Sequence, residues 1–185
     1  MAEYYLISQL PSLDGISENT PLPITEERFA ELCNRFLGKR AQEMLSKLTL
    51  SPPKNSENSG SALIDAWNEN ERNLRFALGK VRAEKMKKPF DTENRIFPVE
   101  YIKAASAAIE IENPMEAEKY LNSYRLEILE TLRPMDSFSE DYIFYYGLKL
   151  KLLLRIRQFD TKSGEKAYKN IYDSILNGDR LEAKQ

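Results

Sequence analysis

The sequence predicts a mainly α fold in which about seven helices form one irregular helical bundle. Apolar side chains recur every three or four residues through most of the chain, which places them on one face of a helix. Prolines and capping residues stand near the ends of these periodic segments. Strand-like and helix-like segments do not alternate, as they would in a protein with a parallel sheet.

The N-terminal part combines an extended segment with two short helices. Residues Glu3–Leu10 are rich in aromatic and β-branched side chains and are followed by a proline, so we expect one short strand or extended segment here. Residues 12–23 are predicted to form a loop. Thr25 can then cap a helix that Gly38 ends, and a second helix is predicted over Lys39–Leu48.

A polar segment divides the chain unequally. Residues Ser51–Ser61 (SPPKNSENSGS) hold no apolar side chain other than two prolines. We expect a mobile loop here, within a single helical domain over residues 1–185. The longest periodic segment, Ala62–Lys88, follows, and Gly79 inside it weakens this helix by about 1 kcal/mol relative to Ala. Its apolar residues fall within roughly 60° of one another on a helical wheel: Leu63, Trp67, Leu74, Leu78 and Val81.

The C-terminal half holds four further predicted helices. Pro98 can open a helix over Pro98–Ile111, and Asn113 can cap the next one over Pro114–Leu132. The segment from Ser139 to Phe159 is apolar on two faces, which is typical of a helix at the centre of its domain. A last helix is predicted from Ser163 to Gly178.

The composition excludes several classes of enzyme. The chain has no His and one Cys, so a Ser–His–Asp triad, a Cys–His pair and a Cys-rich zinc site cannot form. Its seven glycines are too far apart for a phosphate-binding loop. We therefore predict no catalytic residue, no cofactor and no metal. The lone Cys and the lack of an apolar span favour a cytoplasmic location.

The strongest local charge feature is the segment Arg72–Lys88. It carries a net charge of +6, whereas the rest of the chain carries −8. The basic side chains occupy one arc of the predicted helix, opposite its apolar stripe, and Phe76 would be exposed among them. An ordinary solvated helix face is the alternative interpretation. The predicted partner-binding residues are Arg72, Arg75, Phe76, Lys80, Arg82 and Lys87.

Three segments resemble a known family. YYLISQLPSL (Tyr4–Leu13), NERNLRFALGKVRAEKM (Asn70–Met86) and YYGLKLKLLLRIRQFDTKSGEKAYKNI (Tyr145–Ile171) are similar to an uncharacterised bacterial family encoded beside V-type ATPase genes. More loosely, the segment Asn70–Met86 also resembles the C/d connector family of V/A-type ATPases, whose members link the rotor ring to the central shaft. The matching positions are Asn73, Leu74, Leu78, Arg82, Ala83 and Lys85 in the second segment, and Leu148, Lys149, Leu150, Leu153, Arg155, Asp160 and Gly164 in the third.

The resemblance implies an all-helical, non-enzymatic protein that acts by contact with protein subunits of a V-type ATPase. The chain is much shorter than the connector proteins, which favours an accessory or assembly role, with attachment to the inner membrane through a protein complex. An RNA- or anionic-lipid-binding module that uses the basic face is the main alternative. A carboxylate-only metal hydrolase is a weaker one.

Overall fold

The structure, a computed structural model, describes residues 2–16, 20–54, 58–91, 98–158 and 168–172. Within these ranges the chain forms helices and irregular connections without a strand, which confirms the predicted mainly α fold. Residues 168–172 are helical. The longer helices are α1 (Ala2–Gln9), α2 (Glu26–Phe36), α3 (Lys39–Ser46), α4 (Ala62–Lys85), α5 (Val99–Glu110), α6 (Pro114–Thr131) and α7 (Glu140–Gln158).

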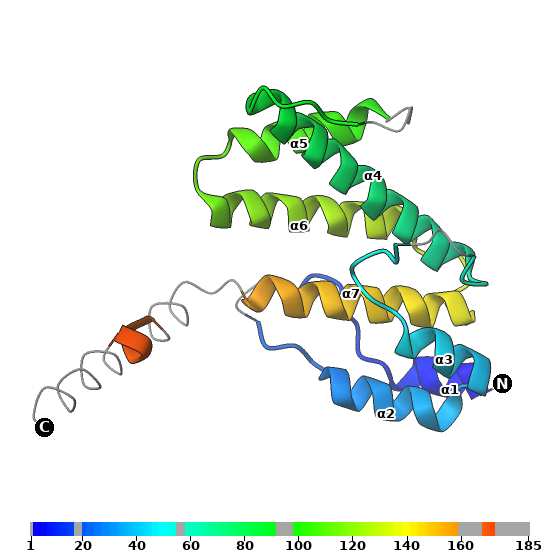
Figure 1. Cartoon of the computed structure of the whole chain (residues 1–185). Coiled ribbons are helices and arrows are strands. Elements are labelled where there is room, and N and C mark those ends of the chain that lie inside the picture. The colour runs from blue at the N-terminus through cyan, green and yellow to red at the C-terminus, as the bar shows by residue number, and fades with distance from the viewer. Residues whose placement is uncertain (1, 17–19, 55–57, 92–97, 159–167, 173–185) are drawn as a thin grey trace, which may run out of the picture.

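Helix α7 lies between two groups of helices (Figure 1). Helices α1, α2 and α3 lie on one side of it, and α4, α5 and α6 lie on the other. All residues from Ile143 to Leu150 are buried, so side chains on every face of this stretch are covered. This confirms the central position that its apolar sequence predicts.

Two apolar cores stabilise these groups. The larger core joins α7 to α1, α2, α3 and the beginning of α4, and the smaller one lies among α4, α5 and α6. Helix α4 contributes Trp67 to the larger core and Leu74 to the smaller one. Helix α6 contributes Leu129 to the larger core and Leu121 to the smaller one. Both helices therefore cross from one core to the other along their length.

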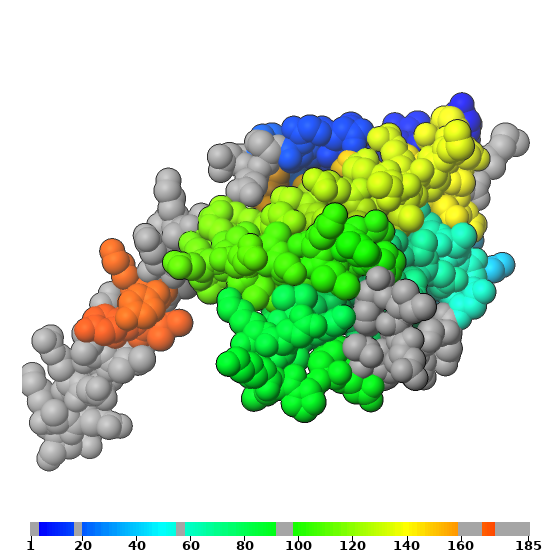
Figure 2. All heavy atoms as spheres, turned by 90° about the horizontal axis from the view of Figure 1, so that it is seen from above, coloured from blue at the N-terminus to red at the C-terminus, as the bar shows by residue number. Residues whose placement is uncertain are grey.

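The N-terminal segment is a helix, so the predicted strand or extended segment over Glu3–Leu10 is wrong. In α1 the side chain of Leu6 is fully buried in the larger core, and Ile7 and Leu10 pack against the same core. These three positions share one helical face. Packing on that face outweighs the strand preference of the aromatic and β-branched residues, because strand preference depends strongly on a neighbouring strand. Figure 2 shows the dark-blue N-terminal helix beside the yellow turn between α6 and α7.

Several predicted helix ends are confirmed, and one is corrected. Thr25 caps α2 by accepting a hydrogen bond from the backbone N–H of Arg28 at 3.2 Å. Asn113 caps α6 in the same way. Gly38 does not end α2, which stops at Phe36; it precedes the first residue of α3 instead.

Two other predictions concern segments that are described only in part. Residues 51–54 and 58–61 of the predicted loop carry no helix, and residues 55–57 lie outside the described residues. The last predicted helix, from Ser163 to Gly178, also lies outside them except for the helical residues 168–172.

Candidate functional site

Arg72 and Arg75, in the first half of the predicted basic face, make hydrogen bonds and ion pairs within the chain. A guanidinium nitrogen of Arg72 donates to the carbonyl oxygen of Pro53 at 3.4 Å. Arg75 donates to the hydroxyl of Ser51 at 3.0 Å and to the carboxylate of Glu71 at 2.8 Å. Arg72 and Arg75 therefore fasten the segment after α3 to α4, a role that the sequence does not reveal.

The second half of this face is a cluster of cations that we call the basic end of α4. Residues 80–88 hold five basic side chains and one acidic one, Glu84, whose carboxylate lies 3.9 Å from the ammonium of Lys80. The cluster consists of Lys80, Arg82, Lys85, Lys87 and Lys88. Arg82, Lys87 and Lys88 are exposed. Three predicted site residues, Lys80, Arg82 and Lys87, thus lie close together at the end of this helix.

An aromatic contact shapes the same end of α4. Phe76, predicted to be exposed, is half-buried, and its ring packs edge to face with Phe90 at a centroid distance of 6.5 Å. The Phe90 ring also lies directly on Gly79, where a Cβ atom would be only 2.9 Å from a ring carbon. This close approach explains the glycine inside the helix. Met86 and Phe90 remain partly exposed and form the apolar part of the basic end.

Lys87 has an unusual backbone conformation. Its φ is +53°, in the left-handed region, and its N–H donates to the carbonyl of Glu84 at 3.1 Å. The N–H of Lys88 donates to the carbonyl of Ala83 at 2.9 Å. This pair of hydrogen bonds usually ends a helix with glycine at the position of Lys87. Lysine in this conformation costs about 1–2 kcal/mol, and strained residues concentrate at functional positions.

A buried charged cluster lies where α4 and α6 cross between the two cores. The guanidinium of Arg125 donates two hydrogen bonds to the carboxylate of Glu71, at 3.0 and 3.2 Å. It also donates to the amide oxygen of Asn122 at 3.1 Å. Its third partner, Glu118, accepts a bond of 2.7 Å from Arg155 of α7. Glu71 is 3% exposed and Arg125 6% exposed, so this cluster connects three helices inside the protein.

Sequence reasoning missed this cluster, although a signal for it was present. Glu71 follows Trp67 by four residues and precedes Leu74 by three, so it lies beside the apolar stripe of α4. Arg125 follows Leu121 by four residues on α6. A charge within an apolar stripe needs a buried partner, and two such charges of opposite sign are a natural pair.

A second charged cluster surrounds Lys149 of α7. The ammonium group lies 2.5 Å from the carboxylate of Asp14, 2.6 Å from that of Glu130 and 3.3 Å from the hydroxyl of Tyr145. A cavity of about 200 Å³ adjoins this cluster, and Asp14, Arg133, Tyr145 and Lys149 are among its lining residues. The cluster ties the segment before α2 to α6 and α7.

The protonation of this cluster argues against a reactive amine. Burial lowers the pKa of Lys149, but its hydrogen bonds to Asp14, Glu130 and Tyr145 outweigh burial and hold the pKa above its usual value. The hydrogen bond from Lys149 lowers the pKa of Asp14. Burial raises the pKa of Tyr145 to about 12. Near neutral pH Lys149 is therefore a cation and not a nucleophile.

The cysteine is likewise held in its unreactive form. Cys33 is fully buried in the larger core beside Leu32 and Phe29. Burial raises the pKa of its thiol to about 12. Since the thiolate is the nucleophile and the metal ligand, Cys33 acts here as a small apolar side chain.

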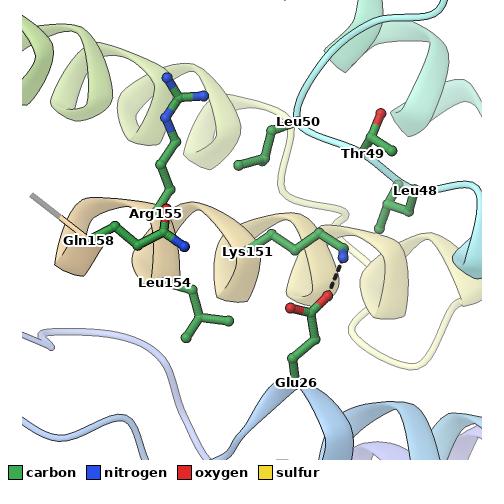
Figure 3. A pocket seen from close by; sticks show the side chains of 8 residues that line it. All are labelled: Glu26, Leu48, Thr49, Leu50, Lys151, Leu154, Arg155 and Gln158. Atoms are coloured by element: carbon green, nitrogen blue, oxygen red, sulfur yellow. Dashed lines mark hydrogen bonds and ion pairs between the residues drawn. The ribbon is translucent and has the colours of Figure 1, made fainter. Parts of the chain in front are cut away.

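A groove of about 500 Å³ runs along the C-terminal half of α7 (Figure 3). Leu48, Thr49 and Leu50 line it from the connection after α3, and Glu26 lines it from the start of α2. An ion pair between Glu26 and Lys151 closes part of it. The charges in this groove serve contacts between helices, so it is a weaker candidate than the basic end of α4.

Metal-binding clusters and membrane-spanning helices are both absent from the described residues. These residues contain no group of three or more His, Cys, Asp or Glu side chains that could hold a metal ion. In the same part of the chain, no helix is both long enough and apolar enough to cross a membrane.

Comparison with known proteins gives a partial match. Residues 98–179 match a family model described as protein of unknown function (DUF2764). The matched segment covers α5, α6 and α7 and therefore includes Arg125 and Lys149. This match confirms the resemblance to an uncharacterised family, and it does not address a link to an ATPase. No curated protein and no solved structure matches the chain significantly.

Proposed function

We propose that this protein is a non-enzymatic helical subunit or accessory protein of a bacterial V-type ATPase. The resemblance of three segments to a family encoded beside V-type ATPase genes supports this partner. One of those segments, Tyr145–Ile171, lies inside the region that the DUF2764 model matches. The proposal places the protein in the cytoplasm, attached to the inner membrane through other subunits of the complex.

Contact rather than catalysis is the proposed mode of action. The buried charges around Glu71 and Lys149 are engaged in ties between helices. Such ties keep the helices in a fixed arrangement, which suits a part that transmits or holds position between subunits. The single observation that carries the proposed contact surface is Lys87, an exposed cation held at φ +53° in the middle of the basic end of α4. Glycine would relieve this strain but would remove the charge.

A pull-down from native membranes tests the proposal. The full-length protein is expected to recover V-type ATPase subunits at low salt, and the double variant Arg82→Glu/Lys87→Glu is expected to lose them. The double variant Lys39→Glu/Lys47→Glu is a matched control, because it reverses two exposed charges at the ends of α3 instead. Recovery of no ATPase subunit by the unaltered protein would overturn the proposal.

Binding of RNA or anionic lipid is the second candidate function. The observation that favours it is the partly exposed ring of Phe90, which packs on the same end of α4 that carries five basic side chains, since aromatic and basic groups together bind nucleic acid. This function predicts binding to RNA or to vesicles of acidic lipid that weakens steeply with salt. Arg82→Glu/Lys87→Glu should abolish it. Absence of binding to both ligands at low salt would exclude it.

A further inference from the structure

A second exposed surface lies at the other end of the molecule, and we call it the aromatic corner. It is formed by α1 and the turn between α6 and α7, which lie side by side (Figure 2). The rings of Tyr4 and Phe138 stack with centroids 4.0 Å apart and an angle of 6° between their planes. Tyr4 is 59% exposed, Phe138 is 44% exposed and Met135 is fully exposed. The corner consists of Tyr4, Tyr5, Met135 and Phe138.

The aromatic corner differs from a single exposed side chain because its rings contact each other. Exposed Leu or Tyr side chains scattered singly are ordinary. Here two rings are ordered against each other across two elements that are far apart in the sequence, and they are still left open to solvent. Aromatic residues and methionine are enriched in the cores of protein interfaces. The corner therefore has the composition of an interface that lacks its partner.

The charge around the corner indicates the chemistry of that partner. Residues 134–142 hold three acidic side chains and no Lys or Arg, and Arg133 just before them pairs with Asp14 at 3.6 Å. Asp136 and Glu140 are exposed beside Phe138. Acidic charge around exposed aromatic faces favours a cation twice, once by Coulomb attraction and once by the attraction of a cation to a ring face. The three acidic residues are Asp136, Glu140 and Asp141.

We infer that the aromatic corner binds a lysine- or arginine-rich amphipathic helix of a partner protein. An apolar stripe on such a helix would cover the stacked rings and Met135, and its basic flanks would face Asp136 and Glu140. The beginning of α4 is tied to this end of the molecule by the hydrogen bond from Ser61 to Asp141. Because α4 is 24 residues long, its two ends lie about 36 Å apart along the helix axis. The basic end of α4 is therefore far from the corner.

With the basic end of α4, the corner would give the protein two docking surfaces of opposite charge at the two ends of α4. It deepens the proposed function, because a contact protein with two such ends can hold two different partners at a fixed distance. The inference about the corner does not depend on the ATPase, and it is tested on the purified full-length protein alone.

The test uses two synthetic helical peptides with the same leucine stripe, one with lysine and one with glutamate at the polar positions. The lysine peptide is expected to bind the full-length protein, and the glutamate peptide is expected not to bind. Tyr4→Ser/Phe138→Ser and Asp136→Lys/Glu140→Lys should each weaken binding of the lysine peptide at least tenfold. Tyr120→Ser is the matched control, because Tyr120 is an exposed tyrosine on α6, and it should leave binding unchanged.

Three results would overturn the inference. The first is equal binding of both peptides, and the second is binding that the corner variants leave unchanged. The third is concentration-dependent self-association of the protein, measured by sedimentation, that Asp136→Lys/Glu140→Lys and Arg82→Glu/Lys87→Glu both abolish. That result would assign the corner to the basic end of a second copy. Failure of the membrane pull-down would leave the peptide result standing, so the two proposals fail separately.

Discussion

Replacing Arg125 by methionine is the sharpest test of the buried charged cluster. The substitution keeps much of the side-chain volume but removes the two hydrogen bonds to Glu71, at 3.0 and 3.2 Å, and the bond to Asn122 at 3.1 Å. It leaves the carboxylate of Glu71, which is 3% exposed, with Arg75 as its remaining basic partner. Removing one partner of a buried ion pair costs about 3–5 kcal/mol.

The expected loss lies near the lower end of that range. Arg75 still donates to Glu71 at 2.8 Å, but its own side chain is nearly half exposed, so it compensates only in part. We expect Arg125→Met to lower the free energy of unfolding by about 3 kcal/mol. For a chain of this size that corresponds to a fall in Tm of about 6–12 °C.

The double variant Glu71→Met/Arg125→Met distinguishes two causes of destabilisation. One is the loss of the attraction between Arg125 and Glu71, and the other is the burial of a Glu71 carboxylate without Arg125. The double variant removes both buried charges, while Glu118 keeps its bond to Arg155. We expect it to be more stable than Arg125→Met by about 2 kcal/mol, because well-packed apolar side chains often replace a buried ion pair without loss. Urea unfolding followed by circular dichroism measures both, with Lys103→Met on the exposed face of α5 as the control. Two results would contradict this prediction. Arg125→Met could lower the free energy of unfolding by less than about 1 kcal/mol, or the double variant could lower it by as much as Arg125→Met does.

Four other predictions concern single positions. Lys87→Gly should raise the free energy of unfolding by about 0.5–1 kcal/mol in urea unfolding, because glycine adopts φ +53° without strain; a loss would contradict the strain. Gly147→Ala should lower the free energy of unfolding by about 1 kcal/mol, because the new Cβ would lie 3.1–3.2 Å from the buried side chains of Leu48 and Phe29, and this crowding costs more than the roughly 1 kcal/mol that alanine gains over glycine inside a helix. The pKa of Asp14 is lower in the folded protein than in the unfolded chain. The ion pairs of Asp14 therefore stabilise the protein fully above about pH 4, and this stabilisation is lost as the pH falls through the pKa of the folded state. In acid unfolding, the stability of Asp14→Asn should converge with that of the unaltered protein at low pH. Cys33 should resist thiol reagents until the protein unfolds, because burial raises its pKa to about 12; rapid labelling of the native protein would contradict its burial.

Most of the helices could be predicted from the sequence, because their signals are local. The caps at Thr25 and Asn113, the proline at the start of α6 and the doubly apolar pattern of α7 all act within a few residues. The N-terminal segment could not be predicted, because its own preference favours a strand. Its helix depends on the burial of Leu6 in a core that α2 and the distant α7 help to build.

The candidate site was predicted in composition rather than in arrangement. The basic residue types on α4 are visible in the sequence, but the use of Arg75 as a tie depends on where Ser51 and Glu71 lie in space. The position of Phe90 on Gly79 could not be predicted either, since it depends on how the chain turns after α4. The aromatic corner requires two segments separated by some 130 residues, and no local pattern brings Tyr4 to Phe138.

Photo-crosslinking at the basic end of α4 tests the proposed contact with a V-type ATPase subunit. A photoreactive amino acid in place of Lys87 is introduced into the full-length protein in its native cells, and the crosslinked product is identified by mass spectrometry. If the basic end of α4 contacts the complex, we expect a covalent adduct with a V-type ATPase subunit, and no such adduct from the same group at the exposed position of Lys39. An adduct with RNA or lipid in place of protein, or ATPase adducts of equal yield from both positions, would contradict it.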